Sequence, residues 1–117
     1  MTNTESVRLV MVAGESSGDQ LAAVLLTGMH ARYAQVSSAG IVGEAMVAQG
    51  AQAWWSSQSL AVRGYFEPIK HLPRILKMRS ELIERTIAMR PDVFIGIDAP
   101  DFNLGVETQL RAQGVPT

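Results

Sequence analysis

The stretch Val93-Phe94-Ile95-Gly96-Ile97-Asp98-Ala99-Pro100-Asp101-Phe102-Asn103 decides the fold of this chain. Its first five residues carry no charge and show no alternation, which predicts a strand covered on both faces in a parallel sheet. Pro100 cannot continue the hydrogen-bond ladder, so we expect the strand to end at Asp98. Because ligands of open α/β sheets bind outside the carboxyl ends of the strands, Asp98 is placed where chemistry occurs.

The composition limits the classes of protein and of site. With 117 residues, 47% of them hydrophobic, the chain is long enough for one domain with its own core. The formal net charge of -1 argues against a general nucleic-acid binder, which needs a basic excess. The chain has no cysteine, which excludes disulfides and thiolate metal sites and favours a reducing, cytosolic setting. Residues 1–6 are polar and Leu21–Leu26 is too short to span a bilayer, so we expect neither a secretory signal nor a membrane span.

Predicted strands alternate with predicted helices along the chain. We expect strands at residues 9–13, within 36–42, at 51–55 and at 93–97. We expect helices from about residue 17 to 29, at 44–49, at 65–89 and at 103–113. This alternation predicts an α/β fold, a Rossmann-like parallel sheet with helices on both faces. Its usual strand order, 3-2-1-4, places the first and fourth strands side by side, so the polar residues after each would meet in one crevice.

Two helices carry more detailed expectations. Ser17 and Gln20 have the spacing of a capping box, and Asp19 suits the positive end of the helix dipole. Pro73 is expected to kink or restart the long helix. The apolar face expected for the first helix consists of Leu21, Val24, Leu25 and Met29. The apolar stripe expected for the long helix consists of Leu72, Ile75, Leu76, Leu82, Ile83 and Ile87.

The first loop, residues 14–19, lacks the patterns of phosphate-binding loops. It reads G-x-x-x-G, not G-x-G-x-x-G, and it has no Gly-Lys-Ser/Thr sequence. Glu15 would also repel a pyrophosphate. A glycine-assisted turn followed by a helix cap accounts for Gly14, Ser17 and Gly18, but not for Glu15. A carboxylate at this end of the sheet suits a hydroxyl-rich ligand.

Asp98 has a structural and a catalytic interpretation. As a structural residue it would cap the following helix, but Asp101 or Asn103 is better placed to do so, which leaves Asp98 without a local structural task. As a catalytic residue, a partly desolvated carboxylate beside an apolar strand can act as a general base. The pattern of residues leaves both interpretations open.

The aromatic and histidine residues have simple structural interpretations. Trp54 and Trp55 could stack on a sugar ring, but we favour one packing in the core while the other shields an edge. His30 and His71 lie on predicted helices, where we expect surface positions. Two isolated histidines do not assemble a metal site.

The segment Arg63–Arg90 is basic. Of the ten basic residues, it holds seven: Arg63, Lys70, Arg74, Lys77, Arg79, Arg85 and Arg90. Its acidic residues are Glu67, Glu81 and Glu84. A solvated helix face is the favoured interpretation, and a surface that docks on anionic lipid, helped by Tyr65 and Phe66, is the alternative.

Two strings of the sequence together resemble bacterial lipid-A-disaccharide synthases: VAGESSGD at residues 12–19 and PDVFIGIDAPDFN at residues 91–103. The string LAVRGYFEPIKHLPRIL, at residues 60–76, is similar to a third block of that family. The resemblance implies a glycosyltransferase with two Rossmann domains, the GT-B type. Such an enzyme joins UDP-activated 2,3-diacylglucosamine to 2,3-diacylglucosamine 1-phosphate, releasing UDP and the β-1,6-linked disaccharide of lipid A.

The resemblance also implies roles for individual residues. Asp98 matches the family's essential aspartate, and as catalytic base it would remove the proton from the acceptor's 6-hydroxyl. Glu15, Ser17, Asp101 and Asn103 match polar residues that line the same cleft and would bind substrate. The implied reaction inverts the anomeric carbon and needs no metal and no cofactor, because the UDP-sugar is a substrate.

Members of the family are considerably longer than this chain. The resemblance therefore implies that residues 1–117 are a truncated, amino-terminal, acceptor-side domain and that the carboxy-terminal UDP-sugar-binding domain is absent. The implied partners are a lipid-linked glucosamine acceptor, a UDP-sugar donor and, through Arg63–Arg90, an anionic membrane, with no nucleic acid. The implied location is cytoplasmic, peripheral on the inner face of the bacterial inner membrane. Arg63 and Pro68 depart from the family pattern, and both lie in the segment expected to meet lipid. The resemblance therefore implies less about the binding of acyl chains than about the reaction.

Two other functions are open at this point. An enzyme like UDP-N-acetylglucosamine 2-epimerase shares the two-domain fold, but the GIDAPDFN string is not its signature. A non-catalytic Rossmann-like module would bind a sugar, a nucleotide or a partner protein without turnover. Release of UDP, as opposed to binding alone, would distinguish these alternatives.

Overall fold

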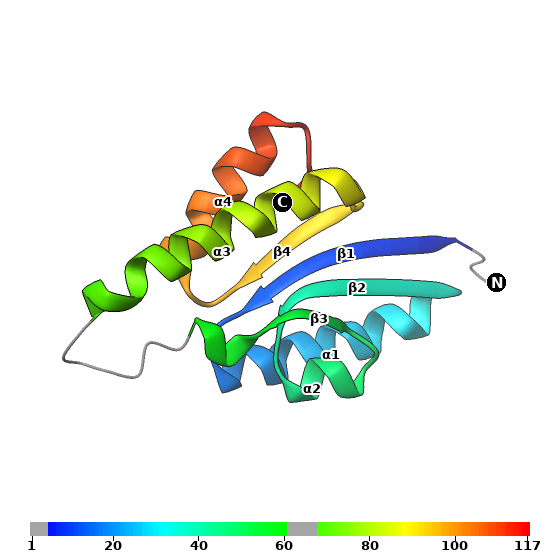
Figure 1. Cartoon of the computed structure of the whole chain (residues 1–117). Helices are drawn as coiled ribbons and strands as arrows, with labels where there is room; N and C mark the ends of the chain where they lie inside the picture. The colour runs from blue at the N-terminus through cyan, green and yellow to red at the C-terminus, as the bar shows by residue number, and fades with distance from the viewer. Residues whose placement is uncertain (1–4, 61–67) are drawn as a thin grey trace.

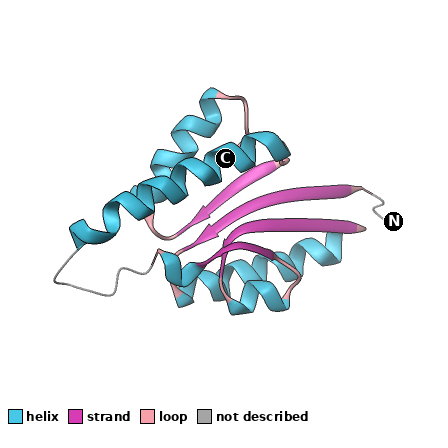
Figure 2. Ribbon diagram, viewed as in Figure 1, coloured by secondary structure: helices cyan, strands magenta, loops and turns pink. Residues whose placement is uncertain are grey.

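A computed structural model describes residues 5–60 and 68–117, with the backbone alone at 68–72 (Figure 1). Strands and helices alternate through these residues, as Figure 2 shows. The elements are β1 (Ser6–Ala13), α1 (Ser16–Arg32), β2 (Gln35–Val42), α2 (Glu44–Ala48), β3 (Gln52–Ser56), the 3-10 helix η1 (Ser57–Ser59), α3 (Pro68–Met89), β4 (Val93–Ile97) and α4 (Pro100–Ala112).

The four strands form one parallel sheet in the order β3-β2-β1-β4, which confirms the predicted α/β fold and strand order. Helices α1 and α2 cover one face of the sheet, and α3 and α4 cover the other (Figure 1). Right-handed crossovers produce this division, because the chain moves one way along the sheet from β1 to β3 and the opposite way from β3 to β4. Ala13 pairs with Ile97, so β1 and β4 end side by side.

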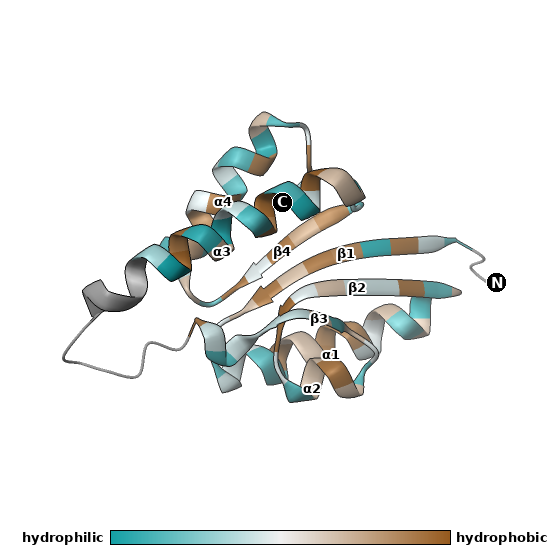
Figure 3. Cartoon of the chain, in the orientation of Figure 1, coloured by the Kyte–Doolittle hydropathy of each residue, from teal (hydrophilic) through white to brown (hydrophobic). Residues whose placement is uncertain are grey.

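Strand β1 is the centre of the core. Leu9 and Met11 point toward α1 and α2, Val10 and Val12 point toward α3 and α4, and all four are fully buried. Burial of each such side chain contributes about 1.5–3 kcal/mol to the free energy of unfolding. Figure 3 shows the hydrophobic colouring along the second half of β1 and on β4, between the two helical layers.

Strand β4 is less buried than predicted, since only Phe94 is buried, Gly96 is exposed and the other three residues are half-buried. Phe94 is 1% exposed and packs in the cluster under α3 and α4. On the other face Val93, Ile95 and Ile97 are half-buried and pack against the cluster that includes Ala22 and Leu26 of α1. Along the outer edge of β4, the backbone N–H of Phe94 donates to the carbonyl of Pro116 at 2.8 Å.

The apolar face predicted for α1 is wrong except at Met29, which is half-buried and packs against the core. Its other members Leu21, Val24 and Leu25 are 62%, 70% and 38% exposed. The face that meets the sheet is formed instead by small residues with one leucine: Gly18, Ala22 and Leu26. Small side chains at i and i+4 let the helix approach the sheet closely. Because glycine and alanine are less hydrophobic than leucine and valine, hydrophobicity alone favours the exposed face over the buried one.

The predicted helix caps differ from the observed ones. Helix α1 begins at Ser16 after Glu15, whose side chain makes no capping bond, so the Ser17 capping box is not formed. Helix α4 begins at Pro100, which is well suited to a first helical position. No side chain caps α4 at its N-cap, so the expectation that Asp101 or Asn103 does so is wrong.

Helix α3 continues through Pro73, so the helix does not restart there. In its apolar stripe Leu82 and Ile83 are buried, whereas Leu76 is 41% exposed. Its expected start at Tyr65 lies outside the described residues, as do Arg63 and Phe66 and the side chains of Lys70, His71 and Leu72. Among the helices that the structure describes, none is long and apolar enough to cross a membrane.

A β-bulge places both tryptophans of β3 against the core. Gly40 pairs with Ala53 and Ile41 with Trp55, so Trp54 is the extra residue on β3. Both rings are half-buried and pack against the cluster under α3 and α4. The guanidinium of Arg85 lies over Trp54, 4.3 Å from the ring centroid. Both rings therefore contribute to the packing of the core.

Candidate active site

Two loops meet where β1 and β4 end, and the carboxylate of Asp98 joins them. The backbone N–H of Gly14 donates to Asp98 Oδ1 at 2.7 Å, and that of Glu15 donates to Asp98 Oδ2 at 3.1 Å. Asp98 is half-buried. Asp98 caps no helix, as expected, but it has a structural task that the sequence did not indicate, since it holds the first loop against the end of β4.

Glycines make room for this carboxylate. A Cβ on Gly18 would overlap Asp98 Oδ2, and a Cβ on Gly14 would lie 3.0 Å from Oδ1. Both positions belong to the G-x-x-x-G string of the first loop, so its glycines serve a carboxylate of the same chain and not a bound phosphate.

The backbone at Asp98 has an unusual conformation. Asp98 and Ala99 have φ values of 55° and 41°, in the left-handed region that residues with a Cβ rarely occupy. Such residues cost about 1–3 kcal/mol each and gather at functional sites. Asn103, which is 2% exposed, supports this turn, because its Nδ2 donates to the carbonyl of Asp98 at 2.8 Å. Gly96 leaves space for it: a Cβ there would lie 2.7 Å from Asn103 Cγ.

A second carboxylate, that of Asp19, has a similar task. Asp19 is 8% exposed, and its oxygens accept from the backbone N–H groups of Ala45 and Met46, each at 2.9 Å. It therefore caps α2 from a different helix. Gly43 permits this contact, since a Cβ there would overlap the Asp19 carboxyl. The sequence does carry a signal for this contact: the N-cap of α2 is Gly43, which has no side chain, so another residue must cap the helix.

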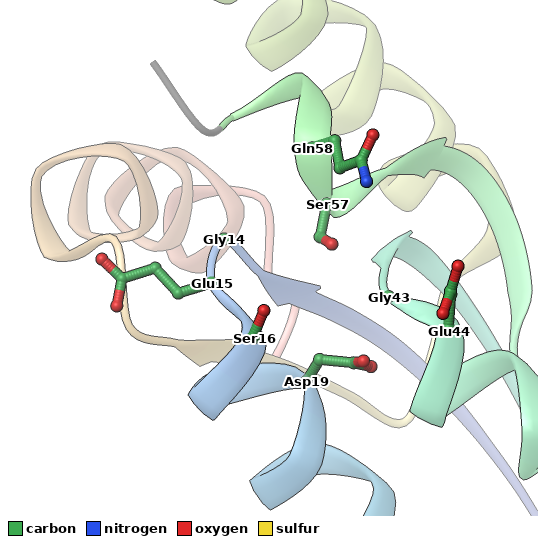
Figure 4. A pocket seen from close by; sticks show the side chains of 8 residues that line it. All are labelled: Gly14, Glu15, Ser16, Asp19, Gly43, Glu44, Ser57 and Gln58. Carbon is green, nitrogen blue, oxygen red and sulfur yellow. The ribbon is translucent and has the colours of Figure 1, made fainter. Parts of the chain in front are cut away.

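A cavity of about 370 Å³, which we call the acidic cavity, opens beside these loops (Figure 4). It is lined by Gly14, Glu15, Ser16, Asp19, Gly43, Glu44, Ser57 and Gln58. Three of these side chains are carboxylates and none is basic. In Figure 4 the Glu15 side chain points away from Ser57 and Gln58, whereas Asp19 points toward Gly43.

The residues predicted for the site are only partly brought together. Asp98 contacts the backbone of Glu15, and Asn103 contacts the backbone of Asp98. Ser17 and Asp101 are exposed, and neither side chain forms a hydrogen bond within the described part of the chain. Sequence reasoning missed Ser57 and Gln58, which line the acidic cavity, and it placed Asp19 in the polar cluster without a role in the site.

The arrangement favours a neutral, hydroxyl-rich ligand over a phosphate. The N–H groups of the loop before α1 and of the first turn of α2 already have Asp98 and Asp19 as acceptors. The nearby Glu15 and Glu44 add negative charge. Carboxylates are good acceptors for sugar hydroxyls. Within the described residues, no group of three or more His, Cys, Asp or Glu side chains is arranged to hold a metal ion.

Comparisons with known proteins agree in pointing to one family. The family described as lipid-A-disaccharide synthetase matches residues 9–117. The chain is 51% identical over 110 residues to the lipid-A-disaccharide synthase of Xanthomonas campestris pv. campestris (strain 8004), covering 94% of this chain and 25% of that protein. It is 46% identical over 114 residues to the synthase of Glaesserella parasuis serovar 5, covering 97% and 30%. For the Burkholderia mallei synthase the identity is 52% over 112 residues, covering 95% and 29%. The chain thus spans 25% to 30% of the length of these relatives.

Proposed function

The chain belongs to the lipid-A-disaccharide synthetase family, and we propose that it supplies the acceptor side of a lipid-A-disaccharide synthase. The whole enzyme would transfer 2,3-diacylglucosamine from its UDP-activated form to 2,3-diacylglucosamine 1-phosphate. The observation that carries the proposal is the position of Asp98, which is held by Gly14 and Glu15 at the carboxyl edge between β1 and β4.

In the proposed reaction Asp98 is the general base. Each of its oxygens accepts one backbone N–H and keeps further lone-pair capacity for a substrate hydroxyl. As the acceptor's 6-oxygen forms a bond to the anomeric carbon of the donor, its proton passes to Asp98. The bond between that carbon and UDP breaks on the opposite face, UDP leaves with the electron pair, and the configuration inverts. A general base contributes about 10²–10⁴-fold to the rate.

The donor's diphosphate would bind outside the described residues. The N–H groups of the loop before α1 and of the first turn of α2 already serve Asp98 and Asp19, and the nearby Glu15 and Glu44 would repel a diphosphate. We therefore assign UDP binding to the part of the longer relatives that this chain does not span. We propose that the reaction uses no metal and no cofactor, and turnover that persists in excess EDTA is the corresponding expectation.

The test is a chimaera in which this chain replaces the matching 110-residue segment of the Xanthomonas campestris relative. With both substrates we expect UDP and a disaccharide in equal amounts. Epimerisation of UDP-N-acetylglucosamine without an acceptor would instead favour the epimerase-like alternative. A folded chimaera that binds sugar and forms no product would favour the binding module.

Asp98→Asn in the chimaera tests the role of the base. We expect kcat to fall by at least about 10²-fold, because the amide cannot take the proton. Asp92→Asn is the matched control: Asp92 also accepts a backbone N–H, from Arg8 at 2.8 Å, but lies at the amino end of β4. Retention of more than about a tenth of kcat in Asp98→Asn would contradict the general-base role.

A further inference from the structure

A second cavity lies beyond η1, between the end of β3 and the middle of α3. Its volume is about 260 Å³. It is lined by Trp55, Ser59, Arg74, Lys77, Met78 and Glu81. None of these residues takes part in the site around Asp98, so the cavity needs an explanation of its own.

The cavity carries two basic side chains without a carboxylate partner. Arg74 and Lys77 are exposed and three residues apart on α3, so they lie on the same side of the helix. Neither forms an ion pair with any carboxylate in the part of the chain that the structure describes. Glu81 also lines the cavity and lowers its net charge, which is still positive. We call this space the cationic cavity.

The chemistry of the cationic cavity suits a phosphate monoester. A guanidinium donates two parallel hydrogen bonds to phosphate oxygens, and an ammonium adds a mobile point charge. The Ser59 hydroxyl lines the cavity and offers a neutral donor. A phosphate monoester carries about −1.5 to −2 charges at neutral pH, which two cations and a hydroxyl can match.

Its aromatic wall is fixed in place. Trp55 packs against the core under α3 and α4, and Met78, 5% exposed, packs in the same cluster. The guanidinium of Arg85 lies 5.8 Å from the Trp55 ring centroid. A wall that is ordered before binding spares part of the entropic cost of holding a ligand.

The 3-10 helix η1 separates the two cavities. Ser57 and Gln58 line the acidic cavity, whereas Ser59 lines the cationic cavity. A sugar phosphate has the matching polarity, with neutral hydroxyls at one end and a dianion at the other. We propose that the cationic cavity binds the phosphate group of the acceptor sugar through Arg74 and Lys77. The identity of the acceptor rests on the proposed function, whereas the phosphate chemistry rests on the cavity itself.

Binding of glucosamine 1-phosphate to the isotope-labelled chain tests the proposal without any need for catalysis. Glucosamine, which lacks the phosphate, is the matched ligand. In NMR spectra we expect only the phosphorylated sugar to shift the indole N–H of Trp55 and the backbone N–H of Ser59. The double variant Arg74→Gln/Lys77→Gln should bind at least about tenfold more weakly, because charge-assisted hydrogen bonds are lost. Arg111→Gln, an exposed residue on α4 outside both cavities, should bind as the parent does.

Unchanged binding in the double variant, or shifts confined to the residues of the acidic cavity, would overturn the proposal. Vesicles distinguish the source of the phosphate. One outcome would assign the site to a lipid headgroup and refute the acceptor assignment. In that outcome the chain binds phosphatidylglycerol vesicles but not phosphatidylcholine vesicles, this binding needs Arg74 and Lys77, and glucosamine 1-phosphate does not bind.

The chimaera gives a second measurement. There the double variant should raise the acceptor KM by about tenfold and leave kcat nearly unchanged, the pattern of lost ground-state binding. Disaccharide formation with an unaltered acceptor KM would refute this inference and leave the proposed function standing. Sugar-phosphate binding that depends on Arg74 and Lys77, in a chimaera that forms no disaccharide, would refute only the proposed function.

Discussion

Replacement of Gly18 by alanine tests the contact on which the candidate active site rests. Gly18 lies in the first turn of α1, and a Cβ there would overlap Asp98 Oδ2 and lie 2.9 Å from Asp98 Cγ. The carboxylate would have to turn away. It would then lose the backbone N–H groups of Gly14 and Glu15.

Two opposing effects set the change in the free energy of unfolding. A hydrogen bond to a charged group contributes about 1.5–3 kcal/mol, and water can replace part of the bond at the exposed Glu15, so we take the loss as about 2–4 kcal/mol. Against this, alanine is favoured over glycine in a helix by about 1 kcal/mol. We therefore expect Gly18→Ala to destabilise the chain by about 1–3 kcal/mol.

Gly28 provides a matched control in the same helix, since a Cβ there would meet nothing within 4 Å. Gly28→Ala should stabilise the chain by about 0.5–1 kcal/mol. Urea unfolding of the parent chain and both variants measures the two effects, which have opposite signs. If Gly18→Ala proves as stable as Gly28→Ala, the carboxylate of Asp98 does not lie against Gly18 and does not hold the first loop.

Four further outcomes are expected. Asn103→Leu removes the amide that supports the left-handed turn at Asp98, so the free energy of unfolding in urea should fall by about 1–3 kcal/mol and the chimaera should have a lower kcat. Parental values for both would contradict the role of Asn103. Asp19→Asn replaces one of the two oxygens that cap α2, so the free energy of unfolding should fall by about 1–3 kcal/mol. Asp101→Asn is the control, at an exposed position without side-chain hydrogen bonds in the described chain, and equal effects of the two substitutions would refute the cap. The basic segment Arg63–Arg90 should bind anionic vesicles at low salt and release them at high salt in co-sedimentation, since each basic group near the surface contributes about 1 kcal/mol; equal binding to neutral vesicles would refute this. Because β4 is the edge strand of the described sheet and has no charge or proline within it, the chain should self-associate with rising concentration in size-exclusion chromatography, and a monomer throughout would contradict this.

The sheet could be predicted because its signals are local or follow general rules. Apolar runs at residues 9–13 and 93–97 mark the strands, and the handedness of crossovers then places β1 beside β4. The meeting of the first loop with Asp98 follows from that order alone. Sequence reasoning therefore located the edge of the sheet at which the polar residues gather.

The contacts within the site could not be predicted, because the partners are far apart in the sequence. Asp98 binds a backbone N–H that is 84 residues away, and Asp19 caps a helix 26 and 27 residues away. Local rules consider a carboxylate only against its own helix, so they give Asp98 no structural task and place Asp19 at the start of α1. The buried face of α1 is not predicted for a related reason. Position 18 must be glycine because the Asp98 carboxylate occupies the space of a Cβ, and the spacing of apolar residues along the helix carries no sign of this contact.

Asp98 combines a structural and a proposed chemical task in one side chain, and this limits what a single substitution can establish. Its two oxygens accept the N–H groups of Gly14 and Glu15, and the same oxygens would take the acceptor's proton. Asp98→Ala would release the loop and remove the base together, so a loss of turnover would not separate the two tasks. Asp98→Asn keeps the shape of the side chain but loses the base and one of its two acceptors, whereas Gly18→Ala keeps the base and displaces it. A fall in kcat in both variants, measured where both are still folded, would require a carboxylate and a defined position for it.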